Sequence, residues 1–215
     1  GRPAAAFDCA MCASRATGTL TPFTRKLRRS IQTRSKSKAP MTSVRSTYGW
    51  RGVAAGTFTV TGDGDFVRSW NSPNQKFNNY GLFVKQGEET TTLFSGVAFH
   101  NNGTIDVQAG RLQLASGGST SGVASIVGGT VELTGGTYTL SEGASIAGAG
   151  QFAGNGGTLN VTGAATVEHL ILSAGNTAIT GNGDLTIAAS AIWTGGNMRV
   201  GGKTKVGPAA TLTIG

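Results

Sequence analysis

Five acidic residues beyond position 100 are the first candidates for chemistry, because enzymes that cleave carbohydrates commonly depend on carboxylates. Glycoside hydrolases need two carboxyl groups that flank the scissile bond, and lyases need a bound cation or a base that abstracts a proton. The five residues are Asp106, Glu132, Glu142, Glu168 and Asp184. No two of them have a spacing that predicts a catalytic pair, although folding can bring distant residues together. We therefore predict a non-catalytic protein without catalytic residues.

The histidines and cysteines do not form a convincing metal site or nucleophilic centre. His100 and His169 are distant in sequence from each other and from any cysteine, so neither a zinc site nor a catalytic triad is predicted. Cys9 and Cys12 have the two-residue spacing of metal and redox sites, but the chain has no second cysteine pair and no βαβ pattern around them. We predict no metal ligands and no cofactor.

Two glycine-aspartate segments resemble the calcium-binding turns of some β-rolls, in which carboxylate and carbonyl oxygens hold the ion. They are residues 62–66 (GDGDF) and 181–185 (GNGDL), and each is one residue short of that motif. The simpler interpretation is a tight Gly-Asp turn, which we favour over calcium binding.

The charge of the chain is divided sharply between two parts. Residues 1–56 contain 11 Lys and Arg against one acidic residue, whereas residues 57–215 contain 7 against 9. A basic run can contact phosphates through counterion release. However, residues 25–38, the most basic stretch, have no interleaved aromatic residues that could stack on bases. We predict that residues 1–56 are a disordered basic segment and that nucleic acid is not a partner.

The composition and patterning of residues 57–215 predict short strands separated by tight turns. The chain contains 35 Gly and 5 Pro, and 13% of its residues are charged. It lacks the three-residue glycine period of collagen, and its many Val, Ile, Leu and Thr residues argue against disorder. Residues 103–114, 129–140 and 157–162 alternate polar with apolar positions, which indicates strands with one buried face.

The spacing of these strands predicts a solenoid rather than a sandwich. Val107, Leu114, Leu133, Leu140 and Leu159 recur at small multiples of about six to seven residues. Three such strands per turn make a coil of about 20 residues, which is the repeat scale of solenoids. We predict an all-β parallel β-helix over residues 57–215. Its first coils, residues 57–102, are expected to be irregular and rich in aromatic residues, and residues 103–215 are expected to form regular coils.

Several asparagines lie between the predicted strands: Asn155, Asn176, Asn182 and Asn197. Asparagines at such corners either bond the backbone and stack into ladders between coils, or remain exposed turn residues. The sequence leaves both interpretations open.

The segment 99–114 (FHNNGTIDVQAGRLQL) resembles the repeat unit of the β-helical passenger and stalk regions of large bacterial surface proteins, the autotransporter and filamentous-haemagglutinin-type adhesins. Residues 193–198 (WTGGNM) resemble the same unit, and the resemblance covers about residues 58–215. It implies a secreted region exposed at the cell surface, with the bacterial outer membrane as the expected location. The chain ends directly after a strand pattern without a polar capping coil, which predicts a fragment of a longer protein.

We therefore expect a structural and adhesive segment whose polar lateral faces bind carbohydrate or a surface protein of a host or neighbouring cell. Membrane contact is expected only through regions outside this chain, because no apolar stretch approaches the roughly 18 to 20 residues of a transmembrane helix. The alternative is a carbohydrate-active β-helix enzyme, a polysaccharide lyase or hydrolase, with carboxylates stacked on one face beside a groove.

Overall fold

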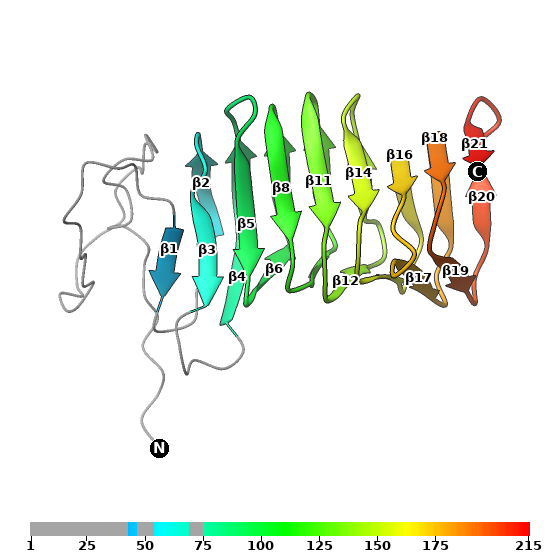
Figure 1. Ribbon diagram of the computed structural model, residues 1–215, viewed down its shortest axis with the longest axis horizontal. Coiled ribbons are helices and arrows are strands. Elements are labelled where there is room, and N and C mark those ends of the chain that lie inside the picture. Colours follow the sequence, from blue (N-terminus) through cyan, green and yellow to red (C-terminus); the bar gives the residue numbers. More distant parts are fainter. Residues whose placement is uncertain (1–42, 47–53, 69–74) are drawn as a thin grey trace, which may run out of the picture.

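The computed structural model describes residues 43–46, 54–68 and 75–215, with side chains described from Gly56 onward. Within these ranges the chain forms 21 β-strands and no helix. All of their pairings are parallel. The strands stack coil on coil along the long axis of the molecule (Figure 1). The predicted parallel β-solenoid is confirmed. The disordered segment predicted for residues 1–56 lies mainly outside the described residues, and its described parts, Ser43–Ser46 and residues 54–56, belong to strands.

The strands form three lateral faces, which we call A, B and C. Face A contains β2 (Ala54–Val60), β7 (Thr104–Val107), β10 (Val123–Ile126), β13 (Ser145–Ala147) and β20 (Thr204–Val206). Face B contains β1 (Ser43–Ser46), β3 (Asp65–Arg68), β5 (Thr91–Ser95), β8 (Gly110–Leu114), β11 (Gly129–Leu133), β14 (Gln151–Gly154) and β21 (Thr211–Ile214). Face C contains β6 (Val97–Asn101), β9 (Gly118–Thr120), β12 (Thr137–Leu140), β15 (Thr158–Val161), β17 (Ala178–Gly181) and β19 (Asn197–Val200).

Three longer strands continue around a corner from one face to the next. β4 (Gln75–Lys85) pairs first on face C and then on face A. β16 (Ala165–Leu172) and β18 (Leu185–Trp193) pair first on face A and then on face B. The register between β16 and β18 shifts between Val167 and His169, which marks the bend at this corner.

Coil length changes along the stack. In the first coils, Asp65 of β3 accepts a hydrogen bond from the backbone of Leu93 in β5, 28 residues further along the chain. In a later coil, Glu132 of β11 accepts one from Gln113 of β8, only 19 residues earlier. The predicted repeat of about 20 residues is therefore found in the later coils, whereas the first coils contain longer connections.

The interior of the solenoid is filled from every second position of each strand, as expected for strands with one buried face. In β7, Ile105 and Val107 are buried while Thr104 and Asp106 are half-buried. The first coils are filled by phenylalanines whose rings contact one another: Phe58, Phe66, Phe77, Phe83, Phe94 and Phe99. The later coils are filled mainly by smaller side chains such as Leu133, Leu140, Val161, Ile179 and Ile187.

Close contact between successive coils requires glycine, and Gly118 and Gly181 show the reason. Gly118 has a φ of 141° and Gly181 a φ of 106°, values that L side chains rarely adopt. A Cβ at Gly118 would collide with the carbonyl oxygen of Phe99, and one at Gly181 with that of Val161. These glycines let neighbouring coils approach to backbone distance.

Candidate functional site

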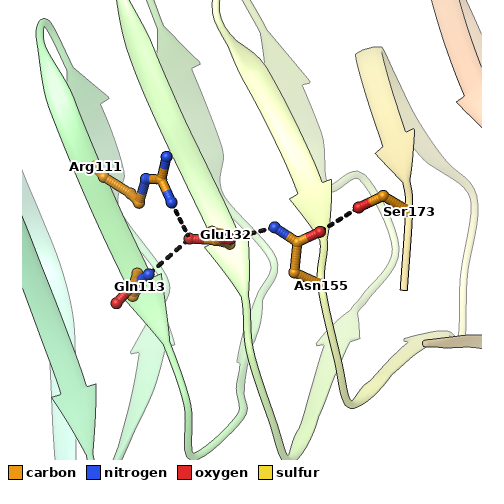
Figure 2. Close-up of polar contacts among 5 residues, drawn as sticks. All are labelled: Arg111, Gln113, Glu132, Asn155 and Ser173. Atoms are coloured by element: carbon orange, nitrogen blue, oxygen red, sulfur yellow. Dashed lines mark hydrogen bonds and ion pairs between the residues drawn. The ribbon is translucent and has the colours of Figure 1, made fainter. Parts of the chain in front are cut away.

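A cluster of five polar side chains on face B connects four successive coils (Figure 2). We call it the Glu132 cluster, and it consists of Arg111, Gln113, Glu132, Asn155 and Ser173. Arg111 and Gln113 belong to β8 and Glu132 to β11, while Asn155 and Ser173 directly follow β14 and β16.

The strand register positions the centre of this cluster. Glu132 points outward because its neighbours Val131 and Leu133 are buried in the core. Gln113 is paired directly with Glu132 in the ladder between β8 and β11. Arg111 lies two positions before Gln113 and therefore on the same side of the strand.

The carboxylate of Glu132 accepts hydrogen bonds at both oxygens. Its Oε2 accepts from a guanidinium nitrogen of Arg111 at 3.1 Å and from Nε2 of Gln113 at 2.7 Å. Its Oε1 accepts from the amide of Asn155, whose own oxygen accepts from the hydroxyl of Ser173. Only 5% of the Glu132 side chain is exposed, against 50% for Arg111. A buried carboxylate needs such partners, because burial of an unpaired charge is costly.

The surroundings of Glu132 favour the ionised form of its carboxylate. Burial raises its pKa, but hydrogen bonds from Gln113 and Asn155, together with the charge and hydrogen bond of Arg111, outweigh burial and lower the pKa below its ordinary value. A general acid needs a raised pKa, and a general base or nucleophile needs a free lone pair. Three donors from the neighbouring coils bind the ionised carboxylate, so Glu132 connects β8, β11 and the residue that follows β14.

The other four acidic residues considered as catalytic candidates also accept hydrogen bonds. Glu142 accepts from the backbone N–H of Ala164 at 2.8 Å, and Glu168 accepts from the backbone N–H of Gly148. These two bonds join neighbouring coils, since their partners lie 22 and 20 residues away.

Asp184 and Asp106 complete this set. Asp184 accepts from the backbone N–H of Lys203 at 2.8 Å and forms an ion pair with Lys205 at 2.7 Å. Asp106 accepts from Gln108 within its own coil. Across the described ranges, no three His, Cys, Asp or Glu side chains gather in a way that could hold a metal ion.

The two histidines lie in different coils, and each forms a hydrogen bond with a serine of the next coil. Nδ1 of His100 lies 2.8 Å from the hydroxyl of Ser119, and Nδ1 of His169 lies 2.7 Å from that of Ser190. A catalytic triad also needs an acid that orients the imidazole. Nε2 of His100 is buried without a hydrogen-bond partner, so this pair lacks an orienting acid. Burial, with a smaller contribution from Lys76, lowers the pKa of His100, which favours a neutral ring.

A buried ladder of polar side chains, which was not predicted from the sequence, runs along the end of face C. The Asn79 amide donates to the Asn101 side-chain oxygen at 2.7 Å, and the Asn101 amide donates to the Thr120 hydroxyl at 3.1 Å. Only 5% of Asn79 and 1% of Asn101 is exposed. A signal was present in the sequence, since both asparagines precede a glycine by two positions and are separated by about one coil length. Of the four asparagines between predicted strands, Asn155 belongs to the Glu132 cluster.

The first predicted Gly-Asp turn is arranged around a buried lysine. Asp63 accepts from the backbone N–H of Thr91 at 2.8 Å, and Asp65 accepts from that of Leu93 at 2.9 Å. Lys85 of β4 reaches the same corner and is fully buried. Burial lowers the pKa of Lys85, while the negative charge of Asp63 opposes this change. This lysine was not predicted from the sequence, because it occupies a position that is apolar in neighbouring coils.

Two further predictions concern other parts of the chain. Cys9 and Cys12 lie outside the described residues. None of the described residues belongs to a helix that is long and apolar enough to cross a membrane.

The parallel β-solenoid class comes from the structure alone, because the comparisons with known proteins found no match. No protein-family model matches the chain. Searches of curated proteins and of solved structures returned no significant match. The resemblance to bacterial surface stalks therefore remains a prediction from the sequence.

Proposed function

We propose that this solenoid is a non-catalytic structural and adhesive segment of a secreted or cell-surface protein. The observation that carries the proposal is that three carboxylates form hydrogen bonds to neighbouring coils. Glu132 is surrounded by donors from neighbouring strands or their ends, and Glu142 and Glu168 bind backbone N–H groups of neighbouring coils. These hydrogen bonds join neighbouring coils, which supports a structural role for the three acids.

The outer surface of face C supports adhesion to a neutral partner. Outward positions in four successive strands, from β9 to β17, are paired in register and carry neutral polar groups: Ser119, Thr139, Asn160 and Thr180. The next position in this row is Arg199 of β19. Adjacent strands lie about 4.8 Å apart, so hydroxyl and amide groups repeat at that interval along the rod. A repeated neutral array suits many weak hydrogen bonds to carbohydrate or to a surface protein better than one tight site.

The experiment is to incubate the full chain with a panel of insoluble polysaccharides and to measure both retention of the protein and release of soluble sugars. The proposal expects retention without product release. Release of oligosaccharides would contradict it and support the alternative, a polysaccharide lyase or hydrolase.

Paired variants test whether face C is the adhesive surface. Thr139→Glu combined with Thr180→Glu introduces charges into the array and is expected to abolish retention. Ser125→Glu is the matched control on face A, where Ser125 points outward between the buried residues Ala124 and Ile126. Equal loss of retention in both proteins would argue against face C.

A further inference from the structure

Lys85 occupies an interior position that belongs to valine in both neighbouring coils. It pairs with Val60 on one side and with Val107 on the other. Its relative exposure is 0%, the same as that of Val107. A lysine is almost never fully buried unless its ammonium group is paired, so the surroundings of Nζ need a specific explanation.

Three oxygen atoms surround the ammonium nitrogen. Nζ of Lys85 donates to the carbonyl oxygen of Gln86 at 2.8 Å, to the hydroxyl of Thr90 at 2.5 Å and to the carbonyl oxygen of Gly62 at 3.4 Å. An ammonium group has three donors and no acceptor. The number of acceptors therefore equals the number of N–H groups.

The oxygen atoms are held in place by the turn that follows β4. The Thr90 hydroxyl, which accepts from Lys85, donates to the carbonyl oxygen of Gly87 at 2.7 Å. Gly87 has a φ of 91°, and a Cβ there would lie 2.5 Å from the carbonyl oxygen of Thr61 and 2.8 Å from the Thr90 hydroxyl. The turn therefore requires glycine at position 87.

A carboxylate and the solvent lie beside this corner. The negative charge of Asp63 acts on Lys85, and Asp63 itself is exposed. Gly62, Gln86 and Thr90 are half-buried. The residues that bind the ammonium group are thus less buried than Lys85 itself.

We propose that Gly62, Gln86 and Thr90 form a binding site for a primary ammonium ion, and that the chain fills this site with its own Lys85 side chain. This assignment differs from the calcium-turn interpretation of residues 62–66, because Asp63 and Asp65 accept from the backbone N–H groups of Thr91 and Leu93. Calcium takes six to eight oxygen ligands, whereas this corner offers three neutral oxygens in the arrangement that an ammonium group needs. The covalently attached cation holds the turn between β4 and β5 against the turn between β2 and β3.

The test removes the attached cation and supplies a free one. Lys85→Ala deletes three methylene groups and the ammonium, which together correspond to n-propylammonium. The melting temperature of this variant is measured with increasing n-propylammonium chloride, and separately with tetramethylammonium chloride or calcium chloride. A ligand that binds only the folded state raises the melting temperature as its concentration increases.

The matched control is Val107→Ala, which opens a cavity at the same register position one coil further along. The proposal expects n-propylammonium to raise the melting temperature of Lys85→Ala well above the effect of tetramethylammonium, and not to do so for Val107→Ala. Equal effects on the two variants, or selective stabilisation of Lys85→Ala by calcium, would overturn it.

A measurement on the unchanged protein covers the case in which Lys85→Ala does not fold. Nuclear magnetic resonance of the lysine side-chain nitrogens reports both protonation and exchange with water. The expected result is a protonated Lys85 at neutral pH whose ammonium hydrogens exchange far more slowly than those of the exposed Lys203. A neutral amine at Lys85, or exchange as fast as at Lys203, would refute the proposal.

Discussion

The coils between β2 and β6 and the coils from β10 onward share one backbone plan but differ in their interior. In the first region, rings such as Phe66 and Phe94 stack with centroids 4.2 Å apart, and a polar ladder and a buried lysine share the interior with them. In the second region the buried positions are mainly aliphatic, as at Leu140 and Val161.

The first region also contains a longer connection, between β3 and β5. Asp65 and Leu93, which are hydrogen-bonded across neighbouring coils of the first region, are 28 residues apart in the chain. His169 and Ser190, which are bonded in the same way in the second region, are 21 residues apart. We infer that longer connections make the stack less regular, so that larger side chains and specific hydrogen bonds are needed to reach the normal packing density of a protein interior. Regular coils reach that density with leucine, isoleucine and valine.

The largest expected effect is the loss of a ring from the first region. Phe94→Ala removes a fully buried ring that contacts Phe66 and Phe99. It should lower the free energy of unfolding by about 3 to 5 kcal/mol. Leu140→Ala in the second region is the comparison, and urea denaturation of both variants measures the difference. A smaller loss for Phe94→Ala than for Leu140→Ala would show that the phenylalanine cluster is loosely packed.

The next effect concerns the Glu132 cluster. Glu132→Ala removes the acceptor shared by Arg111, Gln113 and Asn155. Hydrogen bonds to a charged group contribute about 1.5 to 3 kcal/mol each, and the exposed donors regain water, so a net loss of about 2 to 3 kcal/mol is expected. Thr130→Ala, on the same strand, serves as the control. An equal loss in both variants, measured by urea denaturation, would contradict a special role for the cluster.

Disruption of the polar ladder in the first region should lower stability less than disruption of the Glu132 cluster. Asn101→Ala removes one of the two acceptors of the Asn79 amide, the other being the carbonyl oxygen of Thr104, and should cost about 1 to 3 kcal/mol. Asn160→Ala, at a half-buried outward position of face C, should change stability by about 0.5 kcal/mol or less. Thermal unfolding of the two variants compares an interior asparagine with a surface one, and equal shifts would rule out a stabilising ladder.

A smaller, pH-dependent effect is expected from the same Glu132. Because its pKa is lowered in the folded state, its contribution is complete above the ordinary pKa of glutamate and is lost as the pH falls through the folded-state value. The stability difference between the unchanged protein and Glu132→Gln should therefore shrink on acidification. Urea denaturation from neutral to acidic pH measures it, and a constant difference would indicate that Glu132 is not ionised.

The alternation of residues such as Ile105 and Val107, together with the spacing of the strands, was sufficient to predict a parallel β-solenoid. The cross-coil contacts were not predictable, because the offset between bonded residues varies and decides which side chains meet. Glu132 meets Gln113 across 19 residues and the Asn155 amide across 23. Lys85 was not predicted as an interior residue, because a charged side chain does not match the apolar residues that mark interior positions in the alternating pattern.

Neighbouring coils are joined by hydrogen bonds that run along the rod, and this has a mechanical consequence. Tension applied along the rod would separate coils one after another rather than shear a whole sheet at once. Each released coil could lengthen the chain by roughly 60 Å, since an extended residue spans about 3.3 to 3.6 Å. Because the Glu132 cluster spans four coils, from Arg111 to Ser173, it should make those coils yield together. A pulled molecule would then extend in small steps that are interrupted by one larger release.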